Sequence, residues 1–201
     1  MVKSKVIEHV LNIVKEKGVL RPRELDAYGI PREYLRRLHD RGQIVRVGRG
    51  LYVLPDAEVT EHHTLTQAAK RVPHGIICLL SALQFHGLTT QMPFEVWMAI
   101  EPKAKQPKVD KPVMRFLRFS GPSYKEGIEQ HTIEGVQIKV YNPPKSVADC
   151  FKFRNKIGLD VALESLRDCL RQRKCTADSL WKYARICRVA NIMKPYIEAM
   201  L

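Results

Sequence analysis

The chain lacks the patterns that mark secreted, metal-binding or membrane-spanning proteins. Its five cysteines form no CxxC pair and are odd in number, which argues against a disulfide framework and a zinc site. Two adjacent histidines, His62 and His63, have no carboxylate or cysteine at ligand spacing, so we expect no metal. The longest apolar run, Ile76 to Leu80, is far too short to cross a bilayer. With no apolar signal segment at the start, we expect a cytoplasmic protein without membrane contact.

Motifs of catalysis are also missing. The sequence has no GxxxxGK[ST] loop, no GxGxxG after a strand, and no GxSxG frame around Ser81, which we expect to be a core hydroxyl. It also lacks the Gly-Ser loop and closely spaced carboxylates of common nucleotidyltransferases. We therefore expect a protein that is not an enzyme and binds no cofactor.

Positive charge is abundant. The 201 residues carry a formal net charge of +13, which favours a polyanion or an acidic protein surface as partner. Residues 1–56 contribute +5, so the basic character extends along the whole chain. Between Arg21 and Gly50 there are eight arginines, four acidic residues and no lysine. Arginine has the planar donor group that suits phosphate oxygens and the guanine edge in the major groove.

An amphipathic helix is predicted from Pro31 to Arg41. Proline is tolerated in the first turn of a helix, and Gly42 suits the end. Steps of 100° per residue separate an apolar side from a charged side. The apolar side holds Pro31, Tyr34, Leu35 and Leu38, and the charged side holds Arg32, Arg36, Arg37, Asp40 and Arg41.

The flanking residues predict a winged helix-turn-helix. A short supporting helix at Arg21 to Tyr28 and a turn at Gly29 precede the arginine-rich helix. Two β-prone runs, Gln43 to Val47 and Leu51 to Leu54, follow it, and Gly48-Arg49-Gly50 joins them as a hairpin whose glycines supply positive φ. We therefore predict DNA binding, with these candidate residues: Arg21, Arg23, Arg32, Arg36, Arg37, Arg41, Arg46 and Arg49. A structural winged helix with a solvated arginine face, or a protein-docking module, is the alternative.

The expected fold class is α+β in two domains. Residues 1–57 form the winged domain, which a helix from Val2 to Glu16 completes, and residues 58–201 form an α+β domain. In the second domain we expect a buried helix at 76–86, an antiparallel sheet at about 94–141, and a bundle-like helical end at about 143–200. The loop 101–112, rich in lysine and proline, is either a solvated loop or a second phosphate contact.

Three stretches resemble the AbiEi family of bacterial antitoxins: Gly48 to Pro55, Ile77 to Pro93, and Tyr141 to Asp160. The resemblance implies the antitoxin of a type IV toxin–antitoxin system. Its winged domain would bind inverted repeats in its own promoter as an autorepressor. Its partner would be an AbiEii-like nucleotidyltransferase toxin, with or without a stable complex.

The stretch from Lys145 to Lys156 offers a candidate second basic surface, formed by Lys145, Lys152, Arg154 and Lys156. The stretch is either a contact surface or the frame of a helical core, and Phe151 and Phe153 cannot both face one side of a helix. Two other functions compete with the antitoxin hypothesis. One is a one-component, ligand-sensing transcriptional regulator without a toxin partner, and the other is an enzyme recruited to nucleic acid.

Overall fold

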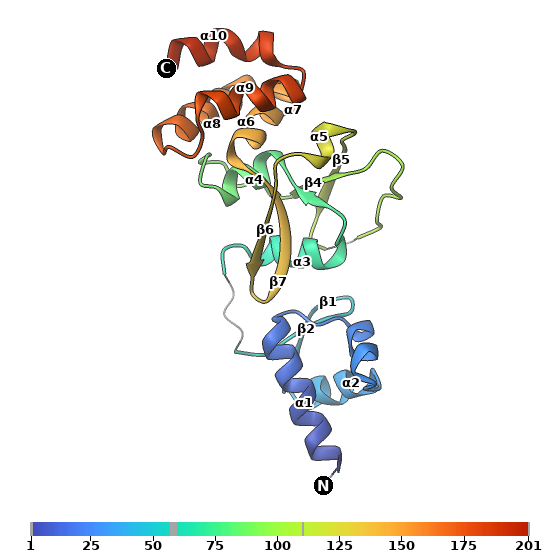
Figure 1. Cartoon of the computed structure of the whole chain (residues 1–201). Coiled ribbons are helices and arrows are strands. Elements are labelled where there is room, and N and C mark those ends of the chain that lie inside the picture. Colours follow the sequence, from blue (N-terminus) through green and yellow to red (C-terminus); the bar gives the residue numbers. More distant parts are fainter. Residues whose placement is uncertain (1, 57–59, 110, 201) are drawn as a thin grey trace. The chain divides into compact units, whose positions relative to one another are not determined.

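The computed structural model describes residues 2–56, 60–109 and 111–200 (Figure 1). By internal contacts the chain divides into two compact units, which we call unit 1 (residues 1–71 with 132–138) and unit 2 (residues 72–131 with 139–201). The elements of residues 1–71 are α1 (Val2–Lys17), the 3-10 helix η1 (Pro22–Tyr28), α2 (Glu33–Asp40), β1 (Val45–Gly48), β2 (Leu51–Val53) and α3 (His63–Arg71).

The elements from residue 72 onward alternate between short strands and helices before the chain becomes helical. They are β3 (Ile76–Ile77), α4 (Leu79–Phe85), β4 (Val96–Ile100), β5 (Met114–Arg118), α5 (Pro122–Lys125), β6 (Ile128–Ile133), β7 (Val136–Tyr141), α6 (Pro143–Lys152), α7 (Arg154–Ile157), α8 (Leu159–Arg171), α9 (Ala177–Ile186) and α10 (Ala190–Met200).

The core of unit 1 follows from the helical spacing of apolar residues in α1. Val10, Ile13 and Val14 are buried, and they belong to one cluster with Leu35 and Leu38 of α2. Helix α1 contacts both α2 and strand β2. A three-helix arrangement with a two-stranded hairpin therefore buries one face of each helix and leaves the other face of α2 in solvent.

Helix α3 belongs to unit 1 by its contacts, and the β6–β7 turn in the same unit anchors its start. The carboxylate of Glu134 accepts hydrogen bonds from the backbone N–H and the hydroxyl of Thr60, both at 2.8 Å, and lies 2.7 Å from Nδ1 of His63. Burial opposes the charge of Glu134, but these bonds outweigh it and lower the pKa of the carboxyl. The predicted boundary between residues 57 and 58 falls at 57–59, outside the described residues, and stays a prediction.

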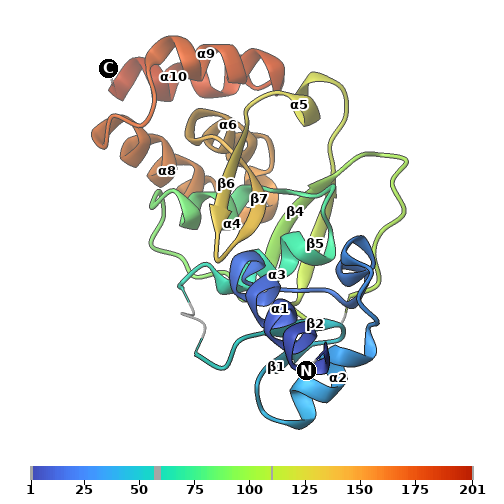
Figure 2. The same cartoon turned by 60° about the horizontal axis from the view of Figure 1, so that its bottom comes forward.

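The sheet that carries unit 2 is mixed, which corrects the prediction of an antiparallel sheet. Its strand order is β5-β4-β3-β7-β6. Strand β4 pairs with β5, and β3 with β7, in parallel, whereas β3 and β4 pair antiparallel. Figures 1 and 2 show β4 and β5 side by side. Parallel neighbours need a connection of about a dozen residues, and the long loop after Ile100 provides it. In its described part this loop holds no helix or strand.

Helix α6 forms the centre of the helical part of unit 2. It contacts α4, α8, α9 and α10, which gather around it in Figure 1, and its residues from Pro144 to Phe151 are all buried. Asn142 caps it by accepting a hydrogen bond from the backbone N–H of Lys145 at 3.0 Å, and Pro143 occupies the first helical position. The helix ends at Lys152, and α7 is a separate turn. The helical region expected at about 143–200 is therefore interrupted at Phe153.

The apolar run after Gly75 differs from the prediction of one buried helix. Ile76 and Ile77 form strand β3 in the middle of the sheet, and helix α4 begins only at Leu79. A fully buried run has the same composition in a central strand and in a core helix, so periodicity does not separate them. Ser81 is buried and accepts a hydrogen bond from the backbone N–H of Trp97 at 3.0 Å, as expected for a core hydroxyl.

The α+β class with an N-terminal winged helix-turn-helix is confirmed. Helices and a small hairpin sheet form the N-terminal part, and a sheet with helices forms the rest. Within the described ranges, no helix is long and apolar enough to span a membrane.

Candidate nucleic-acid interface

Helix α2 is held in place by its apolar side. Leu35 and Leu38 are buried in the core of unit 1, as the amphipathic pattern predicts. The turn before the helix is fixed by Gly29, which takes φ +64°, and the end is fixed by Gly42, which takes φ +69°. His39 near the end of α2 lies with Nδ1 3.2 Å from the carbonyl oxygen of Ile44, which joins the helix to the start of the hairpin. The opposite side of α2 is therefore presented by a fixed scaffold.

Arginines occupy that opposite side. Arg36 is 86% exposed and lies 3.8 Å from Asp40, while Arg37 lies 3.0 Å from Glu33 and over the ring of Tyr34. Both ion pairs join residues one helical turn apart at the surface, where such pairs are worth about 0–1 kcal/mol. A phosphate group can therefore displace the acid at little cost. Arg41 follows the last turn and is also exposed.

Arg32 bridges the two helices of the motif. Its guanidinium forms a two-pronged ion pair with Asp26 of η1, in which Nε donates to Oδ1 at 2.9 Å. This hydrogen bond lowers the pKa of the Asp26 carboxyl and raises the pKa of Arg32. Both side chains are more than half exposed, so Arg32 is accessible at the turn that leads into α2.

Arg21 has a different environment from the other predicted DNA-binding residues. Its Nη1 donates to the backbone oxygen of Lys70 at 2.7 Å, and burial lowers its pKa. Glu24 strengthens this connection, because it accepts from the backbone N–H of Arg21 at 2.7 Å and from Nζ of Lys70 at 2.8 Å. The Arg21 side chain thus ties η1 to α3, whereas Arg23 is exposed.

The hairpin of β1 and β2 forms the wing, and its tip residue Arg49 is exposed. Only Gly50 of the two flanking glycines has positive φ, at +67°. A Cβ atom at Gly48 would lie 2.5 Å from Nη2 of Arg71, the mobile end of a long side chain. The expectation that both glycines supply positive φ is therefore corrected. Arg71 also lies with Nη1 3.4 Å from the carbonyl oxygen of Arg49, a contact that the sequence did not predict.

One of the four residues predicted for the second basic surface does not lie at the surface. Lys145 is fully buried, and its Nζ lies 2.5 Å from Oδ2 of Asp149, one turn later on α6. The rings of Tyr141 and Phe119 lie 4.1 and 5.0 Å from the same ammonium. Lys145 is therefore part of the core, because α6 is surrounded by other elements.

The other three basic residues of that stretch reach solvent to different degrees. Lys152 and Lys156 are exposed, while Arg154 is partly buried and donates from Nη1 to the carbonyl oxygen of Phe151 at 3.0 Å. They remain candidates. The question of whether the stretch is surface or core is answered residue by residue, since Phe151 is fully buried and Phe153 stacks on Phe119 with ring centroids 5.4 Å apart.

Helix η1, the turn, helix α2 and the hairpin define the N-terminal part as a winged helix-turn-helix with arginines on the exposed side of its second helix. Residues 10–55 match the model of a family described as transcriptional regulator, AbiEi antitoxin, which confirms the resemblance predicted from the sequence. This match supports a transcriptional regulator of the antitoxin type.

Two further comparisons complete this result. No curated protein matches the chain. A crystal structure of the RV2827C protein from Mycobacterium tuberculosis has a similar fold, with a TM-score of 0.60 and 13% sequence identity over 98% of this chain and 80% of that one.

Proposed function

We propose that this protein is an antitoxin that represses transcription of its own operon by binding inverted repeats in its promoter, and that it counteracts a nucleotidyltransferase toxin. The observation that carries the DNA-binding half is the arrangement of Arg36 and Arg37 on the solvent side of α2, opposite the buried Leu35 and Leu38. A helix anchored in this way can enter the major groove with its arginines toward base edges and phosphates.

In this proposal, arginines at the turn and at the wing add to the DNA-contacting surface of α2. Arg32 lies at the turn before α2 and Arg49 at the tip of the hairpin, and both side chains are exposed. Phosphate contacts from such flanking residues fix the register of a recognition helix, while contacts from the helix itself read the sequence. An arginine on a wing can also reach an adjacent minor groove.

The antitoxin half of the proposal rests on the family match over residues 10–55 and on the resemblance of residues 141–160. In this proposal the toxin is an AbiEii-like nucleotidyltransferase, and its antagonism does not require a stable complex. Two half-sites of an inverted repeat would be filled by a dimer or by two monomers that assemble on the DNA.

A gel-shift titration tests the repressor half. The purified chain is titrated against the DNA upstream of its own gene, with scrambled DNA of the same length as competitor. We expect a complex that survives the competitor and is lost at high salt, because phosphate contacts release counterions. Equal affinity for scrambled DNA would contradict sequence-specific repression.

Co-expression tests the toxin half. A nucleotidyltransferase encoded beside this gene is induced alone or together with the full chain, and growth is recorded. We expect growth arrest with the nucleotidyltransferase alone and recovery with the chain. Recovery should persist in a variant with Arg36→Ala and Arg37→Ala when both genes are driven by foreign promoters, because repression then plays no part. Continued arrest with well-expressed chain would contradict the antitoxin role.

A ligand-sensing regulator without a toxin partner is the second candidate. One observation favours it: unit 2 contains a cavity of about 430 Å³, a size that suits small-molecule sites. Failure of the co-expression experiment together with success of the gel shift would select this candidate.

A further inference from the structure

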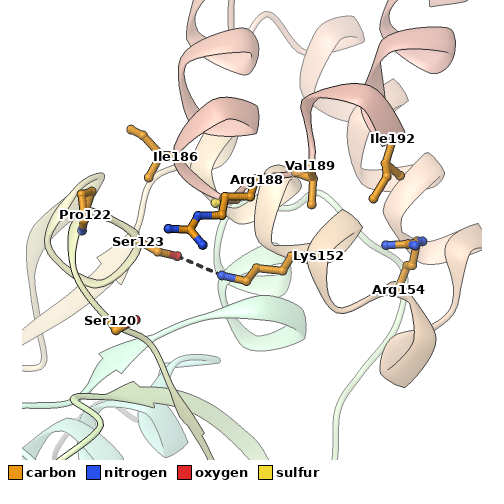
Figure 3. Close-up of a pocket in the computed structure, with 10 residues that line it drawn as sticks. Ser120, Pro122, Ser123, Lys152, Arg154, Ile186, Arg188, Val189 and Ile192 are labelled. Atoms are coloured by element: carbon orange, nitrogen blue, oxygen red, sulfur yellow. Dashed lines mark hydrogen bonds between the residues drawn. The ribbon is translucent and has the colours of Figure 1, made fainter.

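Unit 2 contains a basic cavity that the DNA-binding proposal does not use. It has a volume of about 430 Å³ and opens between the segment before α5, the end of α6, and the link from α9 to α10. Figure 3 shows Lys152 and Arg188 reaching into the same hollow beside Ser123, with Arg154 further along the wall near Ile192. The residues that line it are Ser120, Pro122, Ser123, Lys152, Arg154, Ile186, Cys187, Arg188, Val189 and Ile192.

The charge of this cavity is not compensated. Its lining contains three cationic side chains and no acidic one. Lys152 has a hydroxyl as its hydrogen-bond partner, Ser123 at 3.5 Å, and Arg154 has a backbone carbonyl. Within the described ranges, none of the three takes part in an ion pair. The nearby Asp149 is buried and held by Lys145 and by the thiol of Cys187; it acts on Lys152 through space but is not within ion-pair distance of it.

Some other basic residues of unit 2 do have an acidic partner. Arg115 pairs with Glu95 at 2.6 Å, and Arg171 pairs with Asp168 at 2.9 Å, both within unit 2. Three cations that share one concave space repel one another unless an anion lies between them. The cavity therefore has the electrostatic character of an anion site.

The remaining lining residues indicate which kind of ligand would fit the cavity. Two serines, Ser120 and Ser123, offer hydroxyl donors on the side of Lys152. Val189 and Ile192 add apolar side chains on the side of Arg154, Ile186 adds one beside Pro122, and helix α10 begins at Ala190, next to Val189. The N-terminal end of an eleven-residue helix adds a partial positive charge. A purely inorganic anion would leave most of the volume and the apolar side chains unused.

We propose that this cavity binds a small molecule that carries a phosphate group next to an organic body. Lys152, Arg188 and the hydroxyl of Ser123 hold the phosphate, and the apolar side chains of Val189 and Ile192 contact the body. Arginine and lysine are the usual phosphate ligands, and apolar walls with a few placed polar groups are typical of small-molecule sites. This proposal does not depend on the DNA-binding proposal: the residues that line the cavity lie in unit 2, and the test uses no DNA.

The backbone provides a matched pair of variants. Arg188 has φ +60° and Arg173 has φ +54°. Each residue follows a helix of unit 2, and its backbone N–H donates a hydrogen bond to the carbonyl oxygen three residues earlier. The acceptor is Arg185 for Arg188 and Leu170 for Arg173, both at 3.0 Å. Arg173 does not line the cavity. Asparagine tolerates this left-handed conformation, so Arg188→Asn and Arg173→Asn each remove one charge with little strain.

Isothermal titration calorimetry on the full chain at low salt tests the proposal, with adenosine 5′-monophosphate, inorganic phosphate and adenosine as probes. We expect saturable binding of the monophosphate, weaker binding of inorganic phosphate, and no binding of adenosine. Arg188→Asn should weaken monophosphate binding about tenfold or more, the loss expected for a hydrogen bond to a charged group, while Arg173→Asn should leave it unchanged.

Three results would overturn the proposal. One is the absence of saturable binding of both phosphate-bearing probes. Another is an equal effect of Arg188→Asn and Arg173→Asn, since the cavity would then contribute no more than general charge. The third is equal affinity for inorganic phosphate and the monophosphate, which would remove the organic body from the ligand. Melting curves of both variants should match that of the unchanged chain, so that any loss of binding is not a loss of folding.

Discussion

Helices α2 and α6 contain ion pairs with the same spacing in the sequence and opposite physical character. Arg36 and Asp40 of α2 are 86% and 64% exposed and lie 3.8 Å apart, whereas Lys145 and Asp149 of α6 are both 0% exposed and lie 2.5 Å apart. On α2 the acid is a weak partner that a phosphate can replace. On α6 the acid is required, because an uncompensated charge in the core is costly. Spacing alone therefore does not decide whether a basic residue binds a partner or holds the fold.

The largest effect is expected when the buried pair of α6 is broken. Lys145→Met leaves Asp149 charged and without its cation in the core, where burial already raises the pKa of this carboxyl. We expect a loss of about 3–5 kcal/mol in the free energy of unfolding, measured by urea denaturation. The same substitution at the exposed Lys152, on the same helix, should change stability by less than about 0.5 kcal/mol. Equal effects at the two positions would contradict the contrast between buried and exposed cations.

A double variant sharpens the same comparison. Lys145→Met combined with Asp149→Ala removes both charges, so no unpaired ion remains in the core. We expect this variant to be more stable than Lys145→Met alone, since much of the penalty comes from the remaining charge. The measure is the coupling free energy from a double-mutant cycle in urea. Additive losses would mean that the two residues act through packing and that their charges matter little.

The smallest effect is expected at the exposed pair. Asp40→Asn removes the acid beside Arg36 and a negative charge from the last turn of α2, where the helix dipole disfavours it. Stability in urea should change by less than about 0.5 kcal/mol. Affinity for the upstream DNA should stay the same or rise slightly, because the phosphates meet less negative charge. A marked loss of affinity would mean that Asp40 orients Arg36 for a base contact.

The sequence was sufficient for the winged part because each of its signals is local. Gly42 ends α2 and Gly50 turns the hairpin through positive φ, and the leucine stripe of α2 identifies its buried side. The contact of Arg71 with the carbonyl oxygen of Arg49 was not predicted, since the two residues are 22 positions apart in the chain. Most signals between neighbours in sequence therefore predicted the structure correctly, except that Gly48 does not have positive φ, and a contact between distant residues was missed.

The helical part of unit 2 was harder to predict for the same reason. Asn142 and Pro143 form a local start signal for α6, and the helical end predicted from about residue 143 begins there. Lys145 is buried among side chains that include Phe119 and Tyr141, which lie outside α6, and no pattern within α6 marks it. The cavity near Arg188 combines three segments that are far apart in sequence. Such sites become visible only once the fold brings the segments together.

The most direct test of the central claim is fluorescence anisotropy of the upstream DNA with the unchanged chain and with a variant that carries Arg36→Ala and Arg37→Ala, over a series of salt concentrations. Each arginine that contacts a base should cost about 1–3 kcal/mol, and each lost phosphate contact should reduce the log–log salt slope by about 0.9. We predict at least a tenfold loss of affinity by the variant, with urea stability unchanged within about 0.5 kcal/mol. Equal affinity and equal salt slope in the two proteins would contradict the assignment of α2 as the recognition helix.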